Sequence, residues 1–332
     1  MMPGVMRSMI GLALASSTIT SASAAEVPAC PTFRWVTLGT AGGPVPTPDR
    51  SEPANLLLAG DRAVLVDAGD GAVGQLAKIG VGLGQIDAVV ISHNHLDHTG
   101  GLAAVIGLRW MNQFPGVLTI YGPQGTKAVV DGIVASMAAP AAIGFGLGAL
   151  PPQPADKVKV VELTDGAEQS IGPFVMKVAA NSHFDHAGPH TANAPQSFSI
   201  RFAMDSRVIV YTGDTGPSAM LASFAKGATL LVSEVIDLDR IVGAIRQSRK
   251  DASPEMLADM ERHLATHHLR PEEVGKIAGE AGVSRVVLTH FAIPPGPLAQ
   301  SEPALRQGIA TRFAGTVDLA RDLSSFDLGC VR

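Results

Sequence analysis

Short runs of apolar and β-branched residues recur along the chain, and each is the length of a strand. In the first half these runs cover 33–39, 54–60, 62–69, 87–93 and 117–122. In the second half they cover 158–163, 174–180, 197–204, 207–213, 229–235, 285–290 and 316–322. Patterns typical of helices lie between and after them, at 71–79, 102–113, 254–266, 271–281 and 302–313. The alternation predicts an α/β fold, an α/β/β/α sandwich of two mixed sheets face to face with helices outside.

The ends of the chain suggest processing and export. Residues 1–25 combine Arg7, a short apolar segment at 9–15 and the small residues Ala22, Ser23 and Ala24, a pattern that predicts a signal peptide. We therefore expect a periplasmic or secreted protein. No low-complexity or linker-like segment interrupts the remainder, which predicts a single domain over 26–332. Cleavage would remove one positive charge from a chain whose net charge is already −5.

Two cysteines and one uncharged stretch leave open questions. Cys30 and Cys330 stand near the two ends of the mature chain, and in an oxidising compartment they would form either one disulfide or two free thiols. Residues 133–150 carry no charge, but Pro140 and three glycines interrupt them. We expect a helix end followed by an apolar loop, and no integral membrane segment.

The strand at 87–93 ends in a cluster of polar residues, "HNHLDH". His93 and His95 share one face of an extended chain, so both can reach one metal ion. Asp97 and His98 follow a bend and can point into a second, adjacent position. Imidazole and carboxylate are ligands that zinc accepts, and two metals about 3.5–4 Å apart form a clamp used by hydrolases. The cluster alone cannot complete two coordination shells.

Further ligands are expected at other strand ends. His183 follows "FVMKVAANS", Asp214 follows "RVIVYTG", and His290 follows "RVVLT". His186 competes with His183 for the same role, and we favour His183 because it lies nearer the end of the apolar run. Neither cysteine lies near these residues, and the sequence contains no serine-nucleophile or phosphate-loop motif.

The stretch His93-Asn94-His95-Leu96-Asp97-His98 resembles the HxHxDH motif of the metallo-β-lactamase-fold hydrolases. The resemblance extends from residue 38 to residue 291. It implies that His93, His95 and His183 hold one zinc, that Asp97, His98 and His290 hold the other, and that Asp214 bridges the two. It also implies that Asp67, in "VLVDAG", orients the cluster as a partner of its ligands.

Within that superfamily the chain is similar to the ribonuclease Z branch and to exported zinc arylsulfatases. "LGTAGGP", "LTHF" and the position of His268, twenty-two residues before His290, carry this similarity. The resemblance implies that His268 assists catalysis at the scissile group, although His267 or His263 would serve if it points inward instead. Asp97 is a second candidate for handling protons near the metals.

These features predict an exported hydrolase with two zinc ions per chain that cleaves a small sulfate or phosphate ester through hydroxide generated at the metals. The alternatives are a lactonase or β-lactamase that attacks an acyl carbon, and a metal-binding protein without turnover. We expect no nucleic acid partner, because the chain is acidic and its densest basic stretch, "RQSRK" at 246–250, is short enough to be a solvated loop. The oligomeric state, a homodimer included, stays open.

Overall fold

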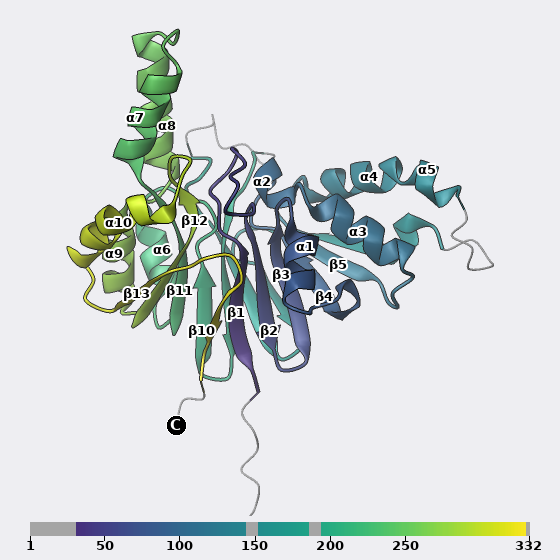
Figure 1. Cartoon of the computed structure of the whole chain (residues 1–332). Helices are drawn as coiled ribbons and strands as arrows, with labels where there is room; N and C mark the ends of the chain where they lie inside the picture. The colour runs from purple at the N-terminus through teal and green to yellow at the C-terminus, as the bar shows by residue number, and fades with distance from the viewer. Residues whose placement is uncertain (1–30, 144–151, 186–193, 330–332) are drawn as a thin grey trace, which may run out of the picture. The chain divides into compact units, whose positions relative to one another are not determined.

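Two seven-stranded sheets lie face to face in the computed structural model, which describes residues 31–143, 152–185 and 194–329 (Figure 1). The first sheet comprises, in spatial order, β14 (Ser324–Asp327), β1 (Phe33–Gly39), β2 (Ala54–Ala59), β3 (Arg62–Ala68), β4 (Ile86–Val90), β5 (Leu118–Gly122) and β6 (Val158–Glu162). The second comprises β13 (Thr316–Leu319), β12 (Arg285–Ala292), β11 (Leu230–Ile236), β10 (Arg207–Tyr211), β9 (Phe198–Met204), β8 (Phe174–Ala180) and β7 (Glu168–Ile171).

Both sheets mix parallel and antiparallel pairs. In the first, β14, β1, β2 and β3 pair antiparallel, whereas β3 to β6 pair parallel. In the second, β10 to β13 pair parallel and β7 to β10 antiparallel. The carboxyl ends of the parallel strands lie at one edge of each sheet, where side chains are free to leave the ladder.

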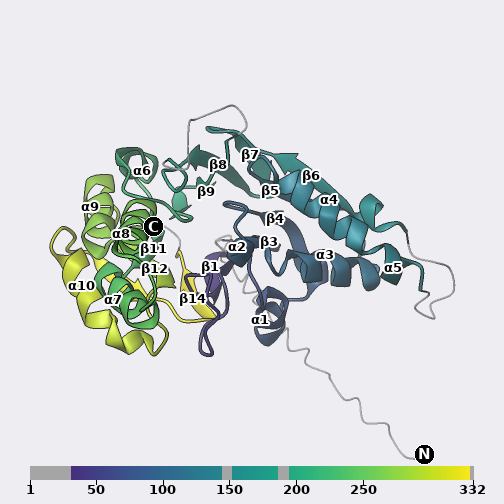
Figure 2. The same cartoon turned by 90° about the horizontal axis from the view of Figure 1, so that it is seen from above.

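Helices cover the outer face of each sheet (Figure 2). The first sheet carries α1 (Ala72–Lys78), α3 (Leu102–Met111), α4 (Thr126–Ser136) and α5 (Ala138–Ala141). The second carries α6 (Ala219–Phe224), α9 (Pro271–Ala281) and α10 (Glu302–Ala310). The α/β/β/α sandwich predicted from the alternation is confirmed.

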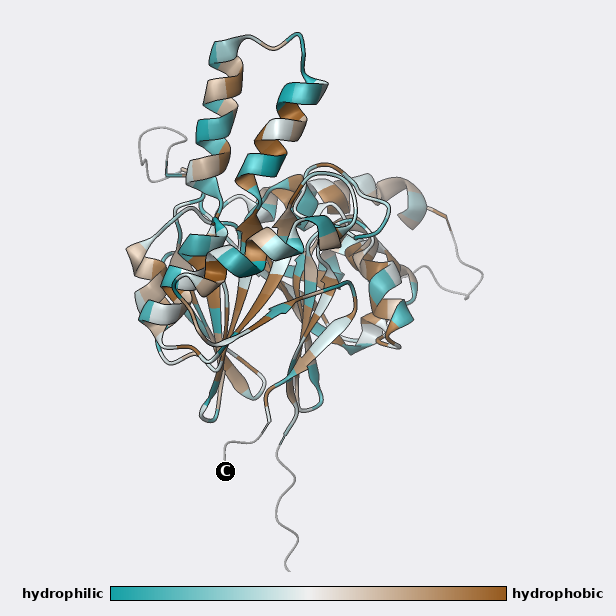
Figure 3. Ribbon diagram, turned by 60° about the vertical axis from the view of Figure 1, so that its left-hand side comes forward, coloured by the Kyte–Doolittle hydropathy of each residue, from teal (hydrophilic) through white to brown (hydrophobic). Residues whose placement is uncertain are grey.

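The apolar core is divided into layers. One cluster fills the space between the sheets and includes Trp35, Phe198, Phe202 and Tyr211, all at most 1% exposed. A second cluster lies between the first sheet and its helices, and a third lies between the second sheet and its helices. Figure 3 shows the corresponding brown strands within the sandwich. Burial on both faces explains why these strands read as continuous apolar runs.

A pair of helices projects from the second sheet: α7 (Leu238–Ser248) and α8 (Pro254–His267) stand away from the strands in Figure 1. Ser253 caps α8, because its side chain accepts a hydrogen bond from the Met256 N–H at 3.2 Å. The prediction of a solvated loop at 246–250 is wrong in part, because residues 246–248 are the last residues of α7. The positions Leu238, Val242 and Ile245 recur at helical spacing and pack toward α8, which outweighs the local charge.

Other expectations met different outcomes. Strands β7 and β14, and helices α2, α5, α6 and α7, were not predicted, because each is short or partly polar. The helix end expected at the start of 133–150 corresponds to the end of α4, whose earlier residues were not predicted. Among the described residues no helix is long and apolar enough to cross a membrane. The predicted signal peptide, both cysteines and the part of the uncharged stretch at 144–150 lie outside the described residues. The neighbours of the two cysteines are described: the carbonyls of Pro31 and Leu328 accept hydrogen bonds from the same Arg207 Nη1, at 2.9 and 3.1 Å.

Candidate metal centre

Three histidines meet where the two sheets open at the strand ends. His93 and His95 follow β4, and His183 follows β8 of the other sheet. His93 Nε2 lies 2.9 Å from His95 Nδ1, and His183 Nε2 lies 3.3 Å from the same atom. One ring nitrogen from each lies within 4.8 Å of the others. We name this group the first triad.

A second group, the acidic tetrad, combines two carboxylates and two histidines. Asp97 and His98 come from α2 (Leu96–Thr99), Asp214 follows β10, and His290 lies in β12. His98 Nε2 lies 3.4 Å from Asp214 Oδ1, and His290 Nε2 lies 3.1 Å from Asp214 Oδ2. Asp97 Oδ2 lies 3.6 Å from His98 Nε2 and 3.7 Å from His290 Nε2.

Asp214 stands between the two groups. Its Oδ2 is 4.0 Å from His93 Nε2 in the first triad, while both its oxygens approach histidines of the tetrad. A carboxylate in this position can serve two cations at once. The structure thus brings together all seven side chains that the sequence proposed as ligands, in the two groups expected.

The donor atoms of these groups fit transition-metal cations. His98 Nε2, His290 Nε2 and Asp214 Oδ1 are buried and have no hydrogen-bond partner among the described residues. Burying such atoms unpaired is costly, and a cation among them removes the cost. Nitrogen and carboxylate ligands suit zinc, and also iron or manganese.

Hydrogen bonds behind the ligands orient their rings. Asp67, fully buried in β3, accepts from Ser92 N at 2.7 Å, from Ser92 Oγ at 2.9 Å and from His98 Nδ1 at 2.9 Å. Because a carboxylate only accepts, His98 carries a proton on Nδ1, and its Nε2 is the atom that faces the tetrad and would bind a cation there. The ring of His183 is oriented in the same way. Its Nδ1 donates to the His267 carbonyl at 2.9 Å, which leaves its Nε2 facing the first triad.

Burial and neighbouring charge separate the two groups electrostatically. Burial lowers the pKa of His93 well below its ordinary value and that of His183 to about 3, which keeps both imidazoles neutral. In the tetrad, burial would raise the pKa of Asp97, but His98 and His290 lower it to about 2. Asp97 is therefore a carboxylate at neutral pH, suited to ligation and unsuited to donating a proton.

His268 lies beside both groups at the end of α8. Its ring centroid is 5.3 Å from that of His183 and 6.0 Å from that of His290. Its Nδ1 lies 2.7 Å from Glu234 Oε2. Burial opposes the charged imidazolium, but Glu234 raises the pKa of His268 to about 9. His268 thus holds a proton at neutral pH, whereas His267 meets His183 through its carbonyl.

Glu234 is the site residue that the sequence analysis missed. It is fully buried in β11, its Oε1 accepts from Thr215 N at 2.6 Å, and its Oε2 also lies 3.9 Å from His290 Nδ1. One glutamate therefore faces both His268 and His290. A charged residue inside the apolar run "TLLVSEV" was the available signal, since an isolated carboxylate is rarely buried without a task.

The loop after β1 forms a wall of the tetrad. A Cβ on Gly43 would lie 2.3 Å from Asp97 Oδ2, so any side chain there would displace the carboxylate. Asp322 holds the loop by accepting from Thr40 N at 3.0 Å and Ser51 N at 2.8 Å. The glycines of "LGTAGGP" thus allow close approach of the backbone.

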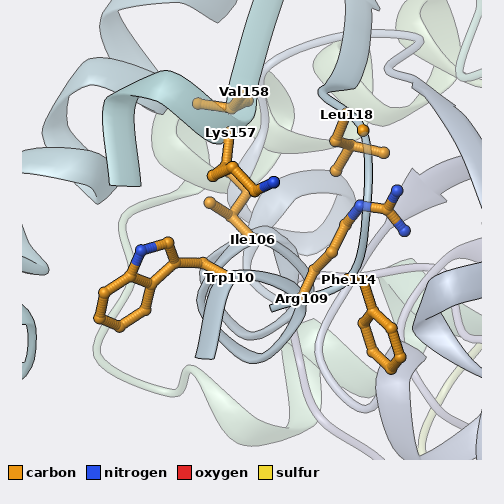
Figure 4. Close-up of a pocket in the computed structure, with 8 residues that line it drawn as sticks. Ile106, Arg109, Trp110, Phe114, Leu118, Lys157 and Val158 are labelled. Atoms are coloured by element: carbon orange, nitrogen blue, oxygen red, sulfur yellow. The ribbon is translucent and has the colours of Figure 1, made fainter. Parts of the chain in front are cut away.

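A separate hollow lies between α3 and the β5–β6 edge of the first sheet (Figure 4). Two of its polar side chains are engaged by the fold, because Trp110 Nε1 donates to the Pro152 carbonyl at 2.6 Å and Arg109 Nη2 to the Pro115 carbonyl at 3.2 Å. None of the seven ligand candidates lines it. We assign it no part in the chemistry.

Comparison with known families identifies the class of protein. A family model described as "Beta-lactamase superfamily domain" matches residues 62–291, so the chain belongs to the β-lactamase superfamily. It is a metal-dependent hydrolase, and the alternative of a protein without turnover is set aside. More particularly, it is similar to "Ribonuclease Z" of Mycobacterium marinum, with 32% identity over 297 residues, 87% of this chain and 96% of the relative.

Solved structures agree on the fold. The metallo-β-lactamase fold protein YhfI from Bacillus subtilis superposes with a TM-score of 0.65 at 21% identity, over 90% of this chain and 99% of that one. Zn²⁺-bound PqqB from Methylobacterium extorquens superposes with a TM-score of 0.62 at 16% identity, over 89% of this chain and 100% of that one.

These relatives correct several expectations. The Mycobacterium marinum relative is named for a nuclease, so the predicted specificity for a small sulfate or phosphate ester, the arylsulfatase likeness and the exclusion of nucleic acid are wrong. The exclusion failed because the net charge of −5 averages over the whole surface and says little about one site. The signal peptide has no support from the relatives. The alternative ligand His186 lies outside the described residues, and the periplasmic or secreted location stays a prediction.

Proposed function

We propose that the chain is a two-zinc phosphodiesterase that cleaves RNA, acting through a single hydrolase domain over 26–332. The first triad would hold one zinc, the acidic tetrad the other, and Asp214 would bridge them. The observation that carries the proposal is the convergence of seven ligand side chains in two groups. Within each group the ligand atoms lie within 4.8 Å of one another, and Asp214 Oδ2 of the tetrad lies 4.0 Å from His93 Nε2 of the first triad. The relative named ribonuclease Z, matched over 96% of its length, supports RNA as the substrate.

Zinc at these positions supplies activation of water and neutralisation of charge on a phosphate group. The protein supplies orientation. Asp67 fixes the ring of His98 directly, and through Ser92 Oγ, which lies 3.1 Å from His93 Nδ1, it reaches the first triad as well. One buried carboxylate thereby sets ligands of both groups.

His268 is placed to supply the proton that the leaving oxygen needs. Its Nδ1 donates to Glu234, so its Nε2 is the atom available to a substrate lying over the two groups. Glu234 keeps the imidazole charged and aims it. This division of labour resembles general acid catalysis by a histidine backed by a carboxylate, which contributes about 10²- to 10⁴-fold to a rate.

The test uses purified zinc-loaded protein and a labelled precursor transfer RNA with a 3′ extension. We expect cleavage that a chelator abolishes and added zinc restores. Asp214→Asn should abolish cleavage while the variant remains folded, and Asp131→Asn, in an exposed ion pair with Lys127, is the matched carboxylate control. Absence of RNA cleavage by the loaded wild type, or full activity of Asp214→Asn, would overturn the proposal.

A further inference from the structure

The phenol of Tyr211 crosses from one sheet to the metal-orienting aspartate of the other. Tyr211 is the last residue of β10 in the second sheet, and Asp67 lies in β3 of the first. The hydroxyl donates to Asp67 Oδ2 at 3.0 Å, and both residues are at most 1% exposed. The bond therefore forms inside the sandwich, shielded from water.

Asp67 depends on donors from both sheets. Ser92 and His98, its other partners, belong to the first sheet and to the segment that follows β4. Tyr211 comes from the second sheet. Asp67 also adopts a φ of 58°, a left-handed conformation that is uncommon and somewhat strained for a non-glycine residue. Loss of one donor therefore removes part of what holds a strained residue.

The apolar surroundings make the hydroxyl informative. The ring of Tyr211 packs 5.5 Å from that of Trp35 within the core between the sheets. A phenylalanine would fill this space equally well. Burying a hydroxyl there is favourable only because it has a partner, and that partner is the carboxylate that orients His98. Burial raises the pKa of Tyr211 well above its ordinary value, so the phenol keeps its proton and acts as a donor.

The position of Tyr211 in the chain links this bond to the acidic tetrad. Asp214 follows three residues after Tyr211, so the backbone that places Asp214 is the one anchored by the phenol. His98 is anchored by Asp67 from the other side. The Tyr211–Asp67 bond thus joins the two supports of the 3.4 Å approach between His98 Nε2 and Asp214 Oδ1.

We propose that Tyr211 is a positioning residue: its hydroxyl locks Asp67 across the two sheets and so keeps His98 and Asp214 in register for the cation of the acidic tetrad. The inference goes beyond the proposed function, although it rests on the same assignment of two zinc positions. It concerns binding of the metal and is independent of the substrate.

The test compares Tyr211→Phe with wild type and with Tyr121→Phe, whose ring borders the same core from β5. Zinc affinity is measured by chelator competition, and the melting temperature of each metal-free protein is recorded. We expect Tyr211→Phe to bind one of its two zinc ions about 10-fold more weakly, the lower end of the effect of removing partners behind ligands. The other zinc should be weakened less, because Asp67 reaches its ligand His93 only through Ser92, and both zincs in Tyr121→Phe should keep wild-type affinity.

Two results would overturn the inference. Unchanged affinity for both zinc ions would show that the hydroxyl does not support the tetrad. Equal weakening of both, together with a lower melting temperature of the metal-free protein, would assign Tyr211 to general core packing. A wild type that binds two zinc ions but does not cleave RNA would refute the proposed function and leave this test intact.

A double-mutant cycle with Ser92→Ala sharpens the result. Ser92 Oγ donates to the same Asp67 oxygen as Tyr211, at 2.9 Å. If both act through Asp67, the loss of zinc affinity in the double variant should differ from the product of the two single losses. Independent, multiplicative losses would contradict an action through the shared carboxylate.

Discussion

The two sheets contribute to the metal centre in different ways. The first sheet provides four ligand candidates from one six-residue stretch, His93 to His98, at the end of β4. The second provides His183 after β8, Asp214 after β10 and His290 within β12, together with Glu234 and His268. The ligands of the first sheet are therefore close together in the sequence. Those of the second sheet meet only after strands β8 to β12 have assembled into the sheet.

This difference places distinct tasks on the two sides. The first sheet orients two of its ligands through one buried carboxylate, since Asp67 bonds to His98 directly and reaches His93 through Ser92. The second holds Asp214, the proposed bridging ligand, and the pair formed by His268 and Glu234, whose Nδ1–Oε2 distance is 2.7 Å. We infer that variants on the second sheet separate metal bridging from proton donation, whereas those on the first affect metal binding alone.

The largest expected effect is that of Asp214→Ala, compared with His95→Ala. Asp214 approaches both groups, so its loss should cost several kcal/mol of transition-state stabilisation, about 10³- to 10⁴-fold in kcat/KM. His95 belongs to the first triad alone, and its removal should spare the zinc of the tetrad. Zinc analysis of both purified variants checks this, and equal zinc content in the two would break the comparison.

Next in size is His268→Asn. Removal of a proton donor should lower kcat about 10²- to 10⁴-fold while zinc content stays at the wild-type level. The control is His263→Asn, a histidine of the same helix that lies outside every candidate ligand group among the described residues. Loss of zinc in His268→Asn would show that His268 is a ligand instead of a proton donor.

Glu234→Gln should have a smaller effect on rate and a distinct effect on pH dependence. His268 donates only when protonated, so activity should fall as the pH rises past its pKa of about 9. Because Glu234 raises that pKa, the glutamine variant should lose activity at lower pH, with about a 10- to 100-fold decrease in kcat near neutrality. An unchanged basic limb of the pH–rate profile would detach Glu234 from His268.

The smallest effect is expected in the projecting α7–α8 pair. Arg246 and Glu261 form an exposed ion pair at 2.7 Å, with side chains 57% and 43% exposed. Arg246→Gln should lower the free energy of unfolding by no more than about 1 kcal/mol and leave zinc binding intact. Denaturant unfolding checks the first part. A larger loss would show that this pair supports the metal centre through α8.

The same contrast explains how much of the fold and of the metal centre could be predicted from the sequence. Period and composition revealed most strands because burial on both faces makes them apolar throughout. The contiguous motif exposed His93 to His98, and strand ends located His183, Asp214 and His290. Glu234 was missed because its partner His268 is thirty-four residues away and only the fold brings them together. Tyr211 was hidden for the same reason, since its partner belongs to the other sheet.

The substrate was beyond the reach of composition. An acidic chain argues against broad electrostatic attraction to nucleic acid, yet cleavage requires only that a phosphate be held at a few atoms. The centre concentrates its polar atoms in a small region between the sheets. The net charge of the whole chain is therefore a poor guide to the substrate of this site.

The most direct test of the account is a crystal structure of the zinc-loaded protein with anomalous scattering recorded at the zinc edge. We predict two peaks about 3.5–4 Å apart, one among His93, His95 and His183 and one among Asp97, His98 and His290, with Asp214 touching both. Absence of zinc from these seven side chains, or a single peak elsewhere on the chain, would contradict the central claim.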